Sequence, residues 1–289
     1  AQDIFDELPL RDVVVWTTLL TGYMDHGLSA EALNCIEMME SDNISPNVFT
    51  YLCALKACCS VNSTISLGHL IHDGVIRRKC ESDAFVCNGL IEMYGKNGSL
   101  KEAQTLFNRL VRPDSVSYGG LIAGYVQLGN GEEALHCFEQ MQSEGLSPNL
   151  VTFTCVLSAC CNSGLLDKAE MLFENMIRKY GVAPNIEHHT CMLVAYAYAG
   201  NFDKAMSIIK VIPSSDYLVA WLALLRACKK WGNVRLGRLA FDQAMQLDDS
   251  CAAAYVLIAN IFAAAGMLDD AERVEVMRWK YAASKEEKK

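Results

Sequence analysis

Residues 13–47, VVVWTTLLTGYMDHGLSAEALNCIEMMESDNISPN, contain two apolar stripes separated by a glycine. The first stripe follows one face of a helix and consists of Trp16, Leu19, Leu20 and Tyr23. The second has the same spacing and consists of Ala32, Ile36 and Met39. Gly27 lies between them, where a turn can use the left-handed backbone conformation that glycine tolerates. The segment therefore predicts two helices joined by a tight turn and packed through their stripes.

This pattern returns along almost the whole chain of 289 residues. Glycines recur at the turn position, 31–36 residues apart after a first double interval of 71: Gly27, Gly98, Gly129, Gly164, Gly200, Gly232 and Gly266. An alanine stands five residues after each of the first five: Ala32, Ala103, Ala134, Ala169 and Ala205. Repetition at this period predicts an all-α solenoid in which each helical hairpin packs on its neighbours.

Proline followed by Asn or Asp marks the ends of four repeats, at Pro46-Asn47, Pro113-Asp114, Pro148-Asn149 and Pro184-Asn185. Proline stops the preceding helix, and the Asn or Asp side chain is expected to accept hydrogen bonds from the first amides of the next helix. Ser99 and Glu102 have the spacing of a capping box, so we also expect a capped helix after Gly98.

Residues 13–47 resemble a pentatricopeptide repeat (PPR), and the alternation of 35, 36 and 31 residues resembles the P, L and S motifs of plant editing-type (PLS) proteins. A tetratricopeptide array would keep a constant period of about 34 residues. The resemblance implies a right-handed α-solenoid superhelix. It divides the chain into a partial S motif (1–12), P (13–47), L (48–83), S (84–114), P (115–149), final L (150–185) and final S (186–217). Residues 218–251 and 252–289 are similar to two extension (E) motifs, the second degenerate and ending in a charged tail.

Each pentatricopeptide motif, by this resemblance, reads one RNA base through its fifth and last residues. Thr17 with Asn47 is the family's combination for adenine, and Asn88 with Asp114 is its combination for uracil, with cytosine tolerated. The other pairs are expected to read weakly or ambiguously: Leu52 with Asp83, Gly119 with Asn149, Thr154 with Asn185, and Thr190 with Asp216 or Tyr217. The expected pattern from 5′ to 3′ is A, any base, U or C, two weak positions, then G if Asp216 is the partner of Thr190.

Second-position residues, by the same resemblance, pack against the faces of the bases: Val14, Phe85 and Val116. Lys96, Lys229 and Lys230 are candidate phosphate contacts, whereas Arg77-Arg78-Lys79 is interpreted as a solvated outer face. The formal net charge of −9 opposes binding to nucleic acid and predicts weak nonspecific affinity with a shallow salt dependence. In the alternative interpretation, the polar residues are ordinary helix-start positions and the Asn and Asp residues are only caps.

No pattern indicates an enzyme, a cofactor or a metal site. The sequence has neither C-x-x-C nor H-x-E, the zinc-deaminase signature, and the 13 cysteines are interpreted as small core residues in a reducing compartment. His188-His189 is interpreted as a polar pair of the final S motif, and Gly129-x-Gly131-x-x-Ala134 follows no strand, as a dinucleotide site requires. The apolar run Cys251–Met267 is too short for a membrane span of about 20 residues.

The resemblance thus implies a single-stranded RNA-binding protein of mitochondria or chloroplasts, a specificity factor for cytidine-to-uridine editing. The deaminase would be a missing DYW domain or a partner that docks on the extension motifs near Trp231 and Trp279. Because the sequence starts inside a repeat, we expect further repeats and a transit peptide to precede it. Two alternatives stay open: an organellar RNA-binding protein for transcript stabilisation or splicing, and a tetratricopeptide-like protein scaffold.

Overall fold

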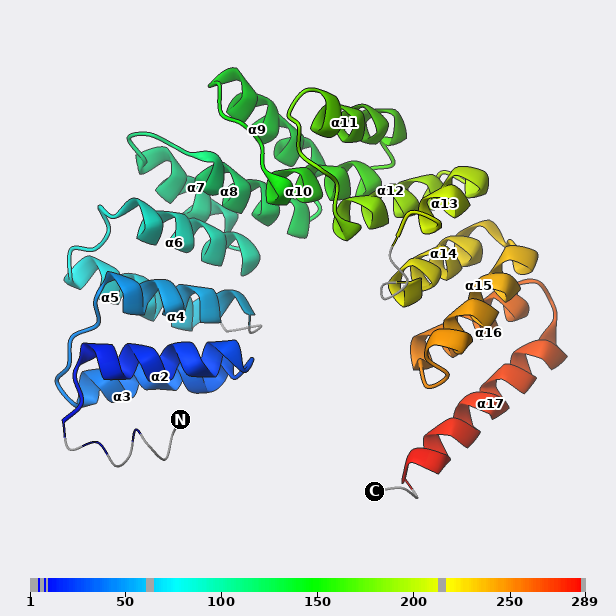
Figure 1. Cartoon of the computed structure of the whole chain (residues 1–289), viewed down its shortest axis with the longest axis horizontal. Coiled ribbons are helices and arrows are strands. Elements are labelled where there is room, and N and C mark those ends of the chain that lie inside the picture. Colours follow the sequence, from blue (N-terminus) through cyan, green and yellow to red (C-terminus); the bar gives the residue numbers. More distant parts are fainter. Residues whose placement is uncertain (1–4, 6–7, 9, 61–64, 213–216, 287–289) are drawn as a thin grey trace. The chain divides into compact units, whose positions relative to one another are not determined.

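A computed structural model describes residues 5, 8, 10–60, 65–212 and 217–286 of the chain (Figure 1). Every regular element within these ranges is an α-helix, and the helices follow one another as hairpins. The predicted all-α solenoid is therefore confirmed. The chain divides into two compact units, Ala1–Cys155 and Val156–Lys289.

The first unit consists of four hairpins and the start of a fifth. Its helices are α2 (Val13–Asp25), α3 (Ser29–Ser41), α4 (Val48–Ser60), α5 (Ile65–Arg77), α6 (Ala84–Lys96), α7 (Leu100–Arg109), α8 (Ser115–Gln127) and α9 (Gly131–Ser143). Helix α10 (Leu150–Asn162) runs across the boundary between the units. The second unit continues with α11 (Leu166–Arg178), α12 (Ile186–Tyr198), α13 (Phe202–Ile209), α14 (Tyr217–Trp231), α15 (Val234–Leu247), α16 (Ala252–Ala264) and α17 (Leu268–Glu286).

The even-numbered helices are the first helices of the hairpins, and within each unit they pack directly on one another. In the first unit α2 contacts α4, α4 contacts α6 and α6 contacts α8; in the second unit α12, α14 and α16 form the same succession. The second helices cover one side of these rows, with α3 against α4, α7 against α8 and α15 against α16. Each unit is thus two layers thick, and the second helices cover only one side of the first-helix layer.

The apolar stripes read from residues 13–47 face the space between the layers. Trp16, Leu20, Ala32 and Met39 are buried, while Tyr23 and Ile36 at the rims of the stripes are half-buried. In several hairpins the fourth residue of the first helix is a large aromatic that meets a phenylalanine of the preceding segment edge to face. These pairs are Phe5–Trp16, Phe107–Tyr118, Phe138–Phe153 and Phe241–Tyr255, with ring centroids 4.6, 4.8, 5.8 and 5.4 Å apart. Such pairs add about 0.5–1.5 kcal/mol each beyond the area they bury.

The turn glycines adopt the predicted left-handed conformation, with φ of 72° at Gly27 and 78° at Gly129. The predicted capping box of Ser99 and Glu102 is wrong, because the Ser99 side chain makes no capping hydrogen bond. Ser99 has ψ of 62°, and Asn130, with ψ of 64°, likewise makes no capping hydrogen bond. Asn201 and Asn233 have larger ψ values of 71° and 83°, and their side chains accept from a backbone amide of the helix.

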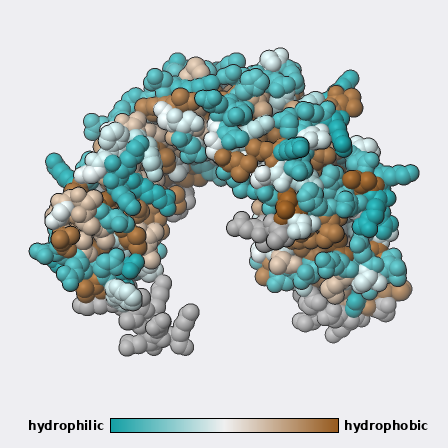
Figure 2. Space-filling view, turned by 180° about the vertical axis from the view of Figure 1, so that it is seen from behind, coloured by the Kyte–Doolittle hydropathy of each residue, from teal (hydrophilic) through white to brown (hydrophobic). Residues whose placement is uncertain are grey.

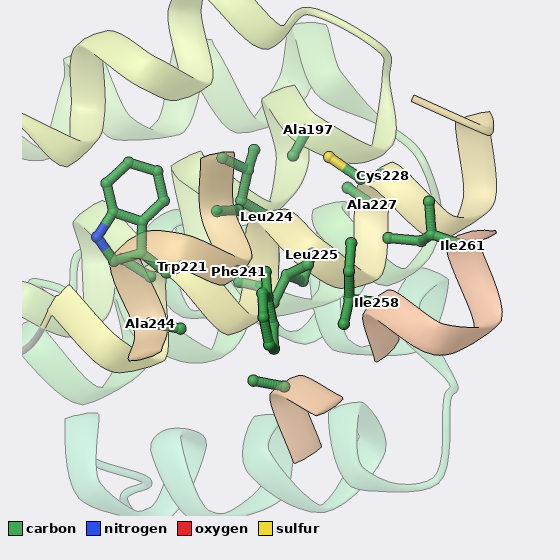
Figure 3. Close-up of a cluster of buried hydrophobic side chains, with 14 of the residues drawn as sticks. Ala197, Trp221, Leu224, Leu225, Ala227, Cys228, Phe241, Ala244, Ile258 and Ile261 are labelled. Atoms are coloured by element: carbon green, nitrogen blue, oxygen red, sulfur yellow. The ribbon is translucent and has the colours of Figure 1, made fainter. Parts of the chain in front are cut away.

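The second unit has a continuous apolar core between α12, α14, α15 and α16 (Figure 3). Trp221, Leu224 and Leu225 of α14 lie beside Phe241 of α15 and Ile258 of α16. Cys228 is fully buried in this core, and none of the thirteen cysteines, which all lie in the described ranges, forms a disulfide. On the face shown in Figure 2, hydrophilic side chains predominate and apolar patches are separate from one another.

Candidate nucleic-acid interface

Asn and Asp residues cap the first helices, as their sequence positions predicted. Oδ1 of Asp114 accepts from the amides of Val116 and Ser117 at 3.0 and 2.8 Å. Oδ1 of Asn47 accepts from the amide of Thr50 at 2.9 Å, and Oδ1 of Asn149 accepts from that of Thr152 at 3.0 Å. Asp12, Asp83 and Asn185 cap α2, α6 and α12 in the same manner. One oxygen of each cap is thereby fixed toward its helix.

The capping bonds also determine whether the second polar atom of each capping side chain is a hydrogen-bond donor or an acceptor. A backbone N–H can only donate, so the atom of Asn47 that faces α4 must be its oxygen, and the amide Nδ2 is the atom left over. In Asp114 the second atom is a carboxylate oxygen, Oδ2. The caps therefore present opposite groups, a hydrogen-bond donor from Asn47 and an acceptor from Asp114.

Asn88 and Asp114, predicted as partners from residues 26 positions apart, are in direct contact. Asn88 Nδ2 lies 3.2 Å from Oδ1 and 3.1 Å from Oδ2 of Asp114. Burial alone would raise the pKa of Asp114, but hydrogen bonds from Ser117, Asn88 and the Val116 amide outweigh it and hold the pKa below its ordinary value. The carboxylate is therefore ionised at neutral pH and stays an acceptor.

An open cavity of about 400 Å³ lies beside this pair, between α4 and α6. Asn88 and Asp114 line it together with Phe85 and Val116, whose side chains are 72% and 55% exposed. The cavity is within the range of about 300–1,000 Å³ common for small-molecule sites. Apolar walls and a carboxylate that accepts hydrogen bonds suit a flat heterocycle with an N–H group, such as a base.

Exposed apolar side chains recur at the second position of the predicted repeats. Val14, Phe85 and Val116 were expected there, and Phe49, Val151 and Val219 share the position, with exposed fractions of 55–72% for the six. The last three were missed, although the repeat register alone could have found them. Large exposed apolar residues at one repeat position indicate a binding surface more than scattered surface residues do.

The second predicted pair, Thr17 and Asn47, is joined through a third residue. Thr17 Oγ1 lies 3.0 Å from Thr50 Oγ1, and the Thr50 hydroxyl donates to Asn47 Oδ1 at 3.0 Å. Thr17 is 6% exposed and Thr50 is fully buried. Thr50 carried no signal in the sequence beyond its place as the third residue of α4.

The other predicted readers make contacts of other kinds. Gly119 faces the Thr152 methyl, which would lie 3.5 Å from an added Cβ. Thr154 and Thr190 each donate to a backbone carbonyl four residues earlier, and Asn185 Oδ1 faces the buried His188 ring. Asp216 lies outside the described residues.

Two of the three predicted phosphate contacts, Lys96 and Lys230, already have partners. Lys96 Nζ forms an ion pair with Glu92 Oε1 at 2.8 Å, and both line the cavity together with Lys56, which was not predicted. Burial would lower the pKa of Lys96, but the hydrogen bond and charge of Glu92 raise it above its ordinary value. Lys230 donates to the Tyr198 carbonyl at 3.2 Å, while Lys229 is exposed.

Within the described part of the chain, no three His, Cys, Asp or Glu side chains are grouped so that they could hold a metal ion. No described helix combines the length and apolar character that crossing a membrane requires.

The fold and the cavity define a class of protein, a helical-hairpin repeat protein with polar pairs between exposed apolar residues. Sequence comparison gives the family. The PPR repeat family pattern matches residues 11–60, 113–162 and 148–193, and the PPR repeat pattern matches residues 85–112 and 187–216. The chain belongs to the pentatricopeptide repeat family.

Relatives in Arabidopsis thaliana match nearly the whole chain. It is 37% identical over 277 residues to the chloroplastic pentatricopeptide repeat-containing protein CRR2, covering 95% of this chain and 42% of CRR2. It is 32% identical over 286 residues to the mitochondrial protein At1g77170, covering 98% of this chain and 61% of that protein. The chain therefore spans less than two thirds of the length of either relative.

A solved structure shares the fold. The pentatricopeptide repeat protein PPR10, in complex with an 18-nucleotide psaJ RNA element, superposes with a TM-score of 0.70 at 14% sequence identity. The match covers 98% of this chain and 42% of PPR10. At this identity the likeness extends to the fold.

Proposed function

We propose that this chain binds single-stranded RNA and selects bases, one for each hairpin that carries a polar pair. The observation that supports this most is the contact between Asn88 and Asp114 in a cavity walled by Phe85 and Val116. Stacking between apolar side chains and hydrogen bonding at the Watson–Crick edge is how proteins read unpaired bases. The RNA complex of PPR10 is a precedent within the family.

The opposite groups of the two caps give the base preferences a chemical basis. Uracil has an N–H at ring position 3, which an acceptor such as the Asp114 carboxylate can bind. Adenine has an unprotonated N1, which needs a donor such as Asn47 Nδ2. These assignments agree with uracil for the hairpin of Asn88 and adenine for the hairpin of Thr17.

We infer further that the protein belongs to the PLS subclass and specifies sites of cytidine-to-uridine editing. The first helices begin at Val13, Val48, Ala84, Ser115 and Leu150, which supports alternating repeats of 35, 36, 31 and 35 residues. An editing role requires a deaminase, supplied by a DYW domain or a partner. Relatives named as chloroplastic and mitochondrial support an organellar location.

The two hairpins from α14 to α17 are the proposed extension motifs and the docking surface for that deaminase. Trp279 is 68% exposed there. Trp231 is 52% exposed, but it already makes contacts within this chain. Its Nε1 donates to the Tyr198 carbonyl at 3.1 Å, and its ring covers Gly200. Trp279 is therefore the better candidate for a partner contact. Retention of the partner by a fragment that ends at Tyr217 would contradict this assignment.

The deciding experiment is selection of bound sequences from a randomised single-stranded RNA pool. The wild-type chain should enrich U two positions 3′ of A. The variant Asn88→Thr with Asp114→Asn should change that U to A, by about 1–3 kcal/mol. Asn34→Thr, on the exposed side of α3, is the control and should select like wild type. Absence of any base preference in the wild-type chain would contradict the proposed function and favour a protein scaffold.

A further inference from the structure

We propose that the Thr50 hydroxyl is a positioning group that couples Thr17 and Asn47, and that base selection by this hairpin depends on it. The proposal rests on the RNA-binding function proposed above. Thr50 belongs to the next hairpin and is fully buried, so it does not itself meet RNA. It acts on the two residues that do.

The contacts of Thr50 reach both residues of the pair. Its Oγ1 lies 3.0 Å from Thr17 Oγ1 and 3.0 Å from Asn47 Oδ1. The backbone N–H of Thr50 donates to the same Asn47 oxygen at 2.9 Å. The backbone N–H of Asn47 in turn donates to Thr50 Oγ1 at 3.3 Å. Asn47 Oδ1 is thus held from two sides, which fixes Nδ2 outward.

A hydroxyl has a single hydrogen, and this makes the arrangement a coupling. If Thr50 donates to Asn47, then Thr17 must donate to Thr50 for their 3.0 Å contact to be a hydrogen bond. If Thr50 donates to Thr17, then Thr17 can donate to the Val13 carbonyl, 2.6 Å away. While the two hydroxyls are hydrogen-bonded to each other, Thr50 can donate to Asn47 only if Thr17 gives up the Val13 carbonyl, so the two readers share one chain of hydrogen bonds.

The other hairpins of the first unit show that this coupling is a particular feature of Thr50. Asn88 and Asp114 bond directly, and Ser117 at the equivalent position bonds only to Asp114. Thr152 caps with Asn149 in the manner of Thr50, but the fifth residue of that hairpin is Gly119, which has no hydroxyl to couple.

Thr152 therefore supplies a matched control. Both threonines are fully buried, are third in their helices and bond to an asparagine cap. Thr50→Val and Thr152→Val each remove one capping hydroxyl while keeping a β-branched side chain. Both should lower the unfolding midpoint by similar amounts, but Thr50→Val should in addition weaken base discrimination. Thr50→Ser, which keeps the hydroxyl, should restore it.

The test measures binding to four RNA oligonucleotides that carry the selected sequence and differ only at the nucleotide preferred as A. Wild type, Thr50→Ser and Thr152→Val should keep the preference for A at that nucleotide, and Thr50→Val should lose about three- to tenfold of it. Selection of U at the nucleotide of Asn88 should stay unchanged in all variants. Full discrimination by Thr50→Val would overturn the coupling while leaving RNA binding intact. A wild-type chain without base preference would overturn both proposals.

Discussion

Gly95 of α6 and Gly124 of α8 bring their helices into backbone contact. A Cβ placed on Gly124 would lie 2.7 Å from the Gly95 Cα, and one placed on Gly95 would lie 3.1 Å from the Gly120 carbonyl oxygen. These helices carry Asn88 and Val116, so their approach sets the spacing across the candidate base site.

Gly124→Ala should separate α6 and α8 and destabilise the protein by about 1–3 kcal/mol, the usual cost of overpacking. Gly22 occupies the same place in α2, but a Cβ there meets nothing within 4 Å. Gly22→Ala should therefore stabilise the protein by about 0.5–1 kcal/mol through helix propensity. Urea-unfolding midpoints measure both, and effects of the same sign would contradict the close approach.

Glu92→Gln should strengthen RNA binding, because it removes a negative charge from the cavity and releases Lys96 for phosphate. For one additional phosphate contact, the slope of log K against log salt should steepen by about 0.7. Glu174→Gln is the control, since Glu174 and Arg178 form an ion pair of the same spacing and the same 2.8 Å length on α11. Equal effects of both substitutions would show that net charge alone is responsible.

Asp114→Ala should destabilise the protein by about 0.5–2 kcal/mol through loss of the cap on α8, whereas Asp114→Asn keeps an acceptor oxygen. The lowered pKa of Asp114 adds a pH dependence. The stabilisation that the carboxylate provides is complete above its ordinary value of 3.8 and is lost as pH falls through the lowered folded-state pKa. The unfolding midpoints of wild type and Asp114→Asn should thus converge at pH values below the folded-state pKa of Asp114. A difference that persists there would assign the effect to another group.

Cys59 and Cys161 should resist alkylation in the folded protein at pH 8. Burial raises the pKa of each thiol to about 12, so neither forms the reactive thiolate at that pH. Mass spectrometry after iodoacetamide treatment should find both unmodified, and both modified when the reaction is repeated in urea. Equal alkylation rates in the folded protein and in urea would mean that both thiols are accessible to the reagent in the folded protein.

Much of the local structure was readable from the sequence because it depends on short-range rules. The period of the apolar stripes predicted the hairpins, and the turn glycines and the Pro-Asn or Pro-Asp ends predicted the turns and caps. The failure at Ser99 is also local, since it concerns one side chain and the first amides of its own helix. Phe49 and Val151 were within reach of the same register and were overlooked.

The sequence by itself determined an all-α repeat fold and the positions of the paired polar residues, because a repeat places equivalent residues at equivalent sites. Tertiary structure alone decided which side chains of successive hairpins meet. Thr50 joins Thr17 to Asn47, and Asn88 contacts Asp114 directly. These contacts depend on how one helix packs on the next, which cannot be read from residue order.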